Sequence, residues 1–300
     1  MRYSSITTRC LQLMATILCM LFISNSIIAQ NRAPQNIRRV TVTFQYVVEN
    51  GKRTETVFPI YQELFDSLGR CHTEIEWSLT DHYPHNFSWN TFNGKQKVLA
   101  EFYLNEKLNT IEEFTYNKDS LLAKRVVKNV SPTDTILSLT YSYKYDSNRN
   151  PIEIIAMSAK GKKVYISKST YNSKGKELTR KVKVKDKFTP QDSIISLLSV
   201  PIYDSIGRLA SEQRTIKKLD KTTTKVTIKY SYDKNNNQIG VLVLNEKGKQ
   251  VSREVREYQF SRNRLSLINY FNSNDVLVKF ITKRYEIYRT NDRKVREIEY

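Results

Sequence analysis

Residues 203–209 read Tyr-Asp-Ser-Ile-Gly-Arg-Leu, and variants of this phrase recur along the chain. Each copy has an aromatic residue, then Asp or Asn, then two variable residues, then Gly or Asn in most cases. From Tyr116 onward the copies lie 26 to 32 residues apart. A regular period of this length indicates a repeat architecture. The clearest copies begin at Phe65, Tyr145, Tyr171, Tyr203 and Tyr232, and weaker copies begin at Phe92, Tyr116 and Phe260.

The residues of the phrase are typical of tight turns. Asp, Asn and Gly tolerate positive φ, and the Asp and Asn side chains can accept hydrogen bonds from the turn backbone. Secondary turns such as Asn93-Gly94 and 245–249 lie between the main ones, so each unit of about 28 residues holds two turns and two strands. Asn50-Gly51, which follows the alternating segment 40–48, is the sharpest hairpin signal.

The segments between turns alternate with a period of two. In 137–145, Leu and Tyr side chains fall on one face, opposite Ser, Thr and Lys, and 224–232 shows the same pattern. This alternation predicts antiparallel strands with one apolar and one polar face. We therefore predict an all-β fold, an elongated, curved or rolled antiparallel sheet of repeated β-hairpins. The recurring Tyr residues are expected to pack on equivalent Tyr residues of the next unit, with their hydroxyls in water.

The turn phrase resembles the YD repeats of the Rhs family, whose core is YDxxGR. Residues 203–208 match this core closely, Tyr145-Asp146 and Tyr232-Asp233 keep the dipeptide, and the resemblance spans roughly residues 60–285. Rhs chains use such repeats to wind a long β-sheet into a hollow shell around a toxin. The resemblance implies a repeated antiparallel sheet in which each unit buries a face against its neighbours. It implies no particular chemistry.

The first 29 residues read as a secretory signal peptide, which would form a helix. Arg2 and Arg9 precede a largely apolar run over 11–28, and Ala29 supplies a small residue at a cleavage site. The alternative is a membrane helix that stays attached. Cleavage would take the formal net charge from +19 to +17 and leave Cys71 as the single cysteine, so no internal disulfide is expected. The predicted location is the periplasm, the outer-membrane surface or the extracellular space.

The remaining chain divides by composition. Residues 30–100 are least repeat-like and hold all three His and both Trp, so we predict an N-terminal β cap there and a hairpin array over 101–300. A membrane barrel is disfavoured because Lys294 and Arg296 would share the lipid face of the last strand. We expect no membrane span after cleavage of the signal.

Motifs for catalysis or cofactor binding are weak. His72, His82 and His85 lie near Cys71 and Glu76, and these residue types can ligate a metal, but their spacing matches no strong zinc pattern. The chain contains no nucleophile elbow, phosphate-binding loop or dinucleotide fingerprint. We predict no catalytic residues, no metal and no cofactor, hence no enzyme. A hydrolase or metal site around the three His is the less favoured alternative.

A lysine stripe is the main candidate for binding. Such a positive face attracts polyanions. The stripe predicts a non-catalytic binding or scaffold module for an envelope protein or an anionic polysaccharide. No nucleic-acid module is recognisable, so nucleic acid is not the expected partner. The alternative is a purely structural repeat protein whose lysines serve solubility. The candidate polyanion-binding residues are Lys181, Lys183, Lys185, Lys187, Lys225 and Lys229.

Overall fold

The computed structural model describes residues 37–78, 84–131, 133–185, 194–259 and 264–287. These residues form eighteen β-strands, and no helix occurs among them. The predicted signal helix lies outside the described residues, as do His82, Lys187, Phe260, Lys294 and Arg296. The strands are β1 Ile37–Glu49, β2 Lys52–Asp66, β3 Cys71–Trp77, β4 Pro84–Asn93, β5 Gln96–Leu104, β6 Lys107–Tyr116, β7 Leu122–Val130, β8 Thr135–Tyr145, β9 Pro151–Ser158, β10 Lys163–Tyr171, β11 Glu177–Val184, β12 Ile194–Tyr203, β13 Leu209–Lys218, β14 Thr223–Tyr232, β15 Gln238–Asn245, β16 Gln250–Gln259, β17 Arg264–Phe271 and β18 Leu277–Ile287.

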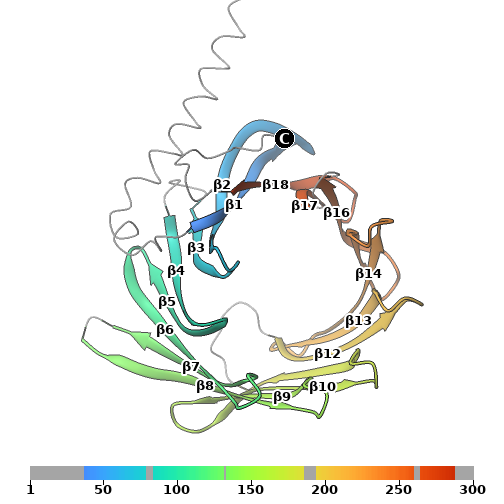
Figure 1. Ribbon diagram of the computed structural model, residues 1–300. Helices are drawn as coiled ribbons and strands as arrows, with labels where there is room; N and C mark the ends of the chain where they lie inside the picture. Colours follow the sequence, from blue (N-terminus) through green and yellow to red (C-terminus); the bar gives the residue numbers. More distant parts are fainter. Residues whose placement is uncertain (1–36, 79–83, 132, 186–193, 260–263, 288–300) are drawn as a thin grey trace, which may run out of the picture.

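The sheet closes on itself. Every strand pairs antiparallel with the next strand along the chain, and β1 pairs with β18 from Arg39 opposite Ile287 to Tyr46 opposite Phe280. Figure 1 shows the resulting ring, viewed down its opening. The predicted all-β class and antiparallel hairpins are confirmed, whereas the expected elongated sheet is instead a closed barrel. Closure satisfies the backbone N–H and C=O groups that an open sheet would leave unpaired at both edges.

Six copies of the turn phrase lie at one rim of the barrel, after the even-numbered strands β2, β6, β8, β10, β12 and β14. Asp204 shows how the phrase works: its Oδ1 accepts hydrogen bonds from the backbone N–H groups of Ile206 (3.1 Å) and Arg208 (2.8 Å). Gly207 then takes φ +85°. The same two acceptor contacts occur at Asp66, Asn117, Asp146, Asn172 and Asp233. The side chain of Asp or Asn therefore fixes the turn.

Two copies of the phrase differ from expectation. The expected copy at Phe92 is a shorter turn, because Asn93 pairs with Gln96 across Gly94 and Lys95. A copy beginning at Phe271, which the sequence reading missed, forms the full turn at the opposite rim. Its Asn272 Oδ1 accepts the N–H groups of Asn274 (2.9 Å) and Val276 (3.1 Å).

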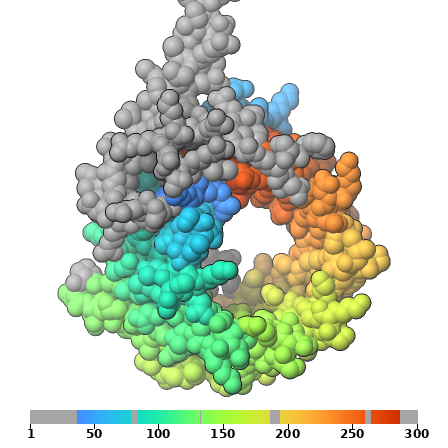
Figure 2. Space-filling view, in the orientation of Figure 1, coloured from blue at the N-terminus to red at the C-terminus, as the bar shows by residue number. Residues whose placement is uncertain are grey.

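From β9 to β14 the two faces of the barrel wall differ in crowding. Residues directly opposite each other across a strand pair lie on the same face of the sheet. Because every strand is paired with both neighbours, the residues of one face can be identified strand by strand around the whole ring. On one face even small side chains such as Ala156, Ser167 and Ser199 are buried, whereas on the other Lys168 and Ser231 are exposed. Side chains converge on the concave side of a closed sheet, so the crowded face lines the lumen. Figure 2 shows that the lumen opens through the ring.

Tyr residues tie neighbouring strands together on the lumen face. The hydroxyl of Tyr145, at the end of β8, donates to the carbonyl of Leu122 at the start of β7 (2.8 Å). Tyr232 makes the same contact with Leu209 (2.9 Å). The sequence did not predict that these hydroxyls would donate to backbone carbonyls of the neighbouring strand. Equivalent hydrogen bonds are made by Tyr116, Tyr171, Tyr258 and Tyr285.

The predicted boundary at residue 100 does not coincide with a break in the sheet. The described residues up to 104 supply β1 to β5, which belong to the same barrel as the hairpins that follow. The assignment of a separate cap stays a prediction. In the described part of the chain, no helix has the length and apolar character needed to cross a membrane.

Candidate functional site

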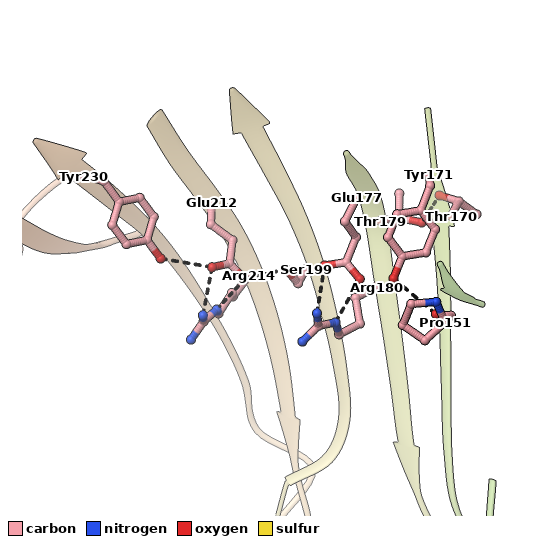
Figure 3. Close-up of polar contacts among 10 residues, drawn as sticks. All are labelled: Pro151, Thr170, Tyr171, Glu177, Thr179, Arg180, Ser199, Glu212, Arg214 and Tyr230. Atoms are coloured by element: carbon pink, nitrogen blue, oxygen red, sulfur yellow. Dashed lines mark hydrogen bonds and ion pairs between the residues drawn. The ribbon is translucent and has the colours of Figure 1, made fainter. Parts of the chain in front are cut away.

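One cluster of polar side chains on the lumen face centres on Glu212 in β13. Its Oε1 accepts hydrogen bonds from the Ser199 hydroxyl and from Arg214 Nε (2.7 Å), and its Oε2 accepts from Arg214 Nη2 (2.8 Å) and from the Tyr230 hydroxyl (3.2 Å). Figure 3 shows these side chains meeting across β12, β13 and β14. Burial raises the pKa of Glu212, but the donors from Arg214, Ser199 and Tyr230 outweigh it and lower the pKa overall. The Glu212 carboxylate therefore accepts hydrogen bonds from three side chains of the wall, and its role is to stabilise the sheet.

Similar pairs of Glu and Arg occur elsewhere on the wall. Arg180 donates to both oxygens of Glu177 at 3.0 Å, on the adjoining hairpin in Figure 3. Two further pairs among the described residues are Arg125 with Glu112 and Arg256 with Glu254. Each carboxylate is matched by a guanidinium, which leaves little net charge on this part of the lumen. Of these pairs, Arg125 with Glu112 joins β7 to β6, whereas the others lie within a single strand.

A cavity of about 550 Å³ interrupts the wall between β2 and β6, near the β5–β6 turn. Its floor includes Ser88, which lies between Glu74 of β3 and Phe102 of β5 in the register. Ser88 is only 3% exposed. A small side chain between two long ones leaves a gap in a close-packed layer, which accounts for the depression.

Carboxylates and aromatic rings line this cavity. Glu74 accepts hydrogen bonds from the Tyr61 hydroxyl (2.7 Å) and the Ser88 hydroxyl (3.1 Å), and Glu76 accepts from Asn86 Nδ2 (3.0 Å). Burial raises the pKa of Tyr61, and the neighbouring Glu74 raises it further, so Tyr61 stays a neutral donor. The other lining residues include Phe87, Phe102, Tyr103, Thr110 and Glu112.

Cys71 lies beside this acidic group. Ligand atoms of Glu63, Cys71 and Glu74 all lie within 4.8 Å of one another. Burial, together with the charges of Glu74 and Glu63, raises the pKa of the Cys71 thiol to about 12. A thiol that holds its proton this firmly is a poor metal ligand and a poor nucleophile. The group therefore offers a cation two carboxylates and little else.

The two described His residues of the predicted cluster lie apart. His72, in β3, contacts the Asp66 carboxylate (Nε2 to Oδ2, 3.2 Å) and packs edge-on against Phe92. His85, at the start of β4, is exposed. β3 and β4 run antiparallel with Trp77 opposite Pro84, so His72 and His85 lie at opposite ends of the hairpin, about 15 Å apart along the strands. These two His residues do not form a shared site.

The candidate lysines lie on the outer face. Lys181 and Lys183 in β11 and Lys225 and Lys229 in β14 are all exposed, and Lys185 is exposed directly after β11. Strands β12 and β13 separate the two sets, which places them about 14 Å apart around the wall.

Three further exposed lysines share this face. Lys168 lies directly opposite Lys181, and Lys144 and Lys168 flank Glu153 at 2.8 and 3.2 Å. Lys124 lies on the same face of β7. The sequence reading missed these residues, because only the register of consecutive hairpins shows that their faces coincide with that of the stripe.

No protein-family model and no curated protein sequence matches the chain. The solved structures to which the chain is similar include the following three. A porin-like protein from Bacteroides uniformis has 10% identity and a TM-score of 0.42, over 84% of this chain and 98% of that chain. A porin-like protein from Bacteroides vulgatus has 9% identity and a TM-score of 0.32, over 82% and 97%. The TcdB2-TccC3-TEV structure has 10% identity and a TM-score of 0.23, over 80% of this chain and 16% of that chain.

Proposed function

We propose that this chain is an exported, non-catalytic β-barrel of the cell envelope that binds an anionic polysaccharide on the basic outer wall of β7 to β14. The observation that carries the proposal is the set of exposed lysines on one continuous face. They are Lys124, Lys144, Lys168, Lys181, Lys183, Lys225 and Lys229.

Few carboxylates offset this charge. The register places Glu113 and Glu153 on the same wall, and both already form ion pairs with lysines. A cluster of cations with little local compensation produces a positive field that concentrates anionic chains. A linear polysaccharide with regularly spaced carboxylates or sulfates could follow the curved wall from one strand to the next. An acidic protein surface is the alternative occupant.

The outer wall also supports a barrel that stands in water. Lys168, Lys181 and Lys229 lie in the middle of their strands rather than at the rims. On a lipid-facing wall each such lysine would cost about 2–4 kcal/mol at the bilayer midplane. This composition favours an envelope protein whose outer surface meets an aqueous layer.

The proposal is tested by retention on immobilised polygalacturonate with elution by a salt gradient. In one variant, Lys181, Lys183, Lys225 and Lys229 are all changed to Glu. The matched control carries the same charge change at four exposed turn residues, Lys160, Lys162, Lys247 and Lys249. We expect the wall variant to elute at much lower salt, because it loses the clustered field, and the control to elute close to the unmodified protein.

Equal shifts in both variants would show that only net charge matters, and unchanged retention of the wall variant would remove these lysines from the binding surface. Either result overturns the proposal. Binding to acidic proteins without binding to the polysaccharide would assign the wall to the alternative occupant and also overturn it.

A further inference from the structure

We propose that the lumen cavity between β2 and β6 is a binding site for a small organic cation, an alkylammonium group carried on a short carbon chain. The cavity lies on the opposite face of the wall from the lysines. The inference is therefore independent of polysaccharide binding.

The first argument is local charge. Three carboxylates line the cavity, and Arg125 neutralises one of them, Glu112. Glu74 and Glu76 are held by neutral donors, namely two hydroxyls and one amide. In the part of the chain that the structure describes, neither of these two has an ion-pair partner. Among the described residues these two carboxylates therefore lack a cationic partner, although the chain has a net charge of +19. A positively charged ligand would offset the cost of holding them in the cavity.

The second argument is the shape and lining of the cavity. Its volume of about 550 Å³ falls within the range of small-molecule sites and far exceeds a bare metal ion. Phe102 lines the cavity across Ser88 from Glu74, and Tyr61 lies on the same face of the wall, opposite Glu76. Aromatic faces attract ammonium groups and also cover the carbon chain that carries them.

The third argument concerns how the carboxylates are held. Ser88 is 3% exposed and donates to Glu74 from the cavity floor, while Tyr61 donates from the β2 side. Two donors from different strands fix the Glu74 carboxylate before any ligand arrives, which reduces the entropy lost on binding. An ammonium group has three donors and can satisfy the remaining lone pairs of Glu74 and Glu76 together.

Isothermal titration calorimetry on the full chain tests this site with putrescine as the probe. The matched neutral probe is 1,4-butanediol, which has the same carbon chain and no charge. Nα-acetyl-lysine methylamide is a third probe, and its affinity relative to putrescine tells whether the ammonium comes from a free polyamine or from a lysine side chain. We expect saturable binding of at least one ammonium probe and none of the diol.

The key variant is Glu74→Gln with Glu76→Gln, which keeps the shape of both side chains. We expect it to weaken binding by at least about tenfold, because the unpaired charges are gone. The matched control is Glu113→Gln with Glu153→Gln on the outer wall, which should bind as the unmodified chain does. If the key variant does not fold by circular dichroism, Phe102→Leu replaces it and should weaken binding several-fold through the lost aromatic face.

Four results would overturn the assignment. They are the absence of saturable binding by both ammonium probes, equal binding of the diol, unchanged affinity in the cavity variants, and competition of putrescine by Ca²⁺ with higher affinity for the metal. Failure here leaves the polysaccharide assay unaffected, since that assay reports on the opposite face.

Discussion

Replacing Glu212 with Ala should destabilise the barrel by about 3 kcal/mol, because three partners lose their acceptor at once. Glu212 is 8% exposed and Ser199 is 4% exposed, so the hydroxyl of Ser199 stays buried without a partner. A buried unsatisfied hydroxyl costs about 1–3 kcal/mol. Arg214 contributes less than a buried partner would, because its side chain is 38% exposed and can turn toward water.

Glu177→Ala is the matched comparison. Glu177 pairs with Arg180 in the same lumen wall, but the Arg180 side chain is 52% exposed. The pair is therefore close to a surface ion pair, and its loss should cost about 1 kcal/mol or less. Urea unfolding followed by intrinsic Tyr and Trp fluorescence measures both changes, provided that the transition is reversible and two-state.

The same network predicts a pH dependence. The pKa of Glu212 is lower in the folded chain than its ordinary value of 4.5. Its stabilisation is therefore present above that ordinary pKa and is lost as the pH falls through the folded pKa. The stability difference between the unmodified chain and Glu212→Ala should shrink in acid. A cost below about 1 kcal/mol at neutral pH, or equal costs for the Glu212 and Glu177 variants, would refute the claim that burial makes this network important.

Two further predictions concern Asp66 and Cys71. Asp66→Ala should cost about 2 kcal/mol at neutral pH, since the carboxylate accepts from two backbone N–H groups and from Arg70. Burial opposes ionisation of Asp66, but these donors still lower its pKa from 3.8 to about 2. The urea midpoints of the unmodified and variant chains should therefore converge as the pH falls from about 4 toward 2. A difference between the midpoints that stays constant over this pH range would contradict the prediction. The pKa of Cys71 is raised to about 12, so its thiol should react slowly with iodoacetamide at pH 8. In the folded chain of residues 30–300 the rate, measured by mass spectrometry, should be lower than in urea by about a hundredfold or more. Comparable rates in the two conditions would show that the thiol is accessible and ionised.

The hairpins were predictable from sequence because their determinants are local. Period-two alternation places Tyr230 and Tyr232 on one face and Lys229 on the other, and the register confirms this. The Asp or Asn of the turn phrase likewise acts within five residues, as Asp204 does.

Closure was not predictable, because it depends on a contact between the two ends of the array. Tyr46 of β1 lies opposite Phe280 of β18, and neither segment carries a local signal for the other. An open sheet and a closed barrel share the same alternation and the same turns. Loop-closure entropy of so long a segment grows only slowly with length, so the paired edges can outweigh it.

The cavity was not predictable for a similar reason. Glu74, Ser88 and Phe102 come from three strands, and only the register brings them into one row. The sequence reading concentrated on His72, His82 and His85, since His residues close in sequence are the conspicuous sign of a metal site. The lysines were easier to place, because their alternation within β11 already defines a face.

The pairing of β1 with β18 is the central claim, because only a closed sheet has a lumen and an outer wall. Thr43 and Lys283 lie directly opposite each other across this pair. In residues 30–300 carrying Cys71→Ser, the double variant Thr43→Cys, Lys283→Cys should form an intramolecular disulfide on mild oxidation, since opposed strand residues have Cβ atoms about 4.5–5.5 Å apart. Thr43→Cys with Val126→Cys, on a distant strand, should stay reduced. Mass spectrometry that finds the first pair reduced, or cross-linked only between molecules, would contradict the closed barrel.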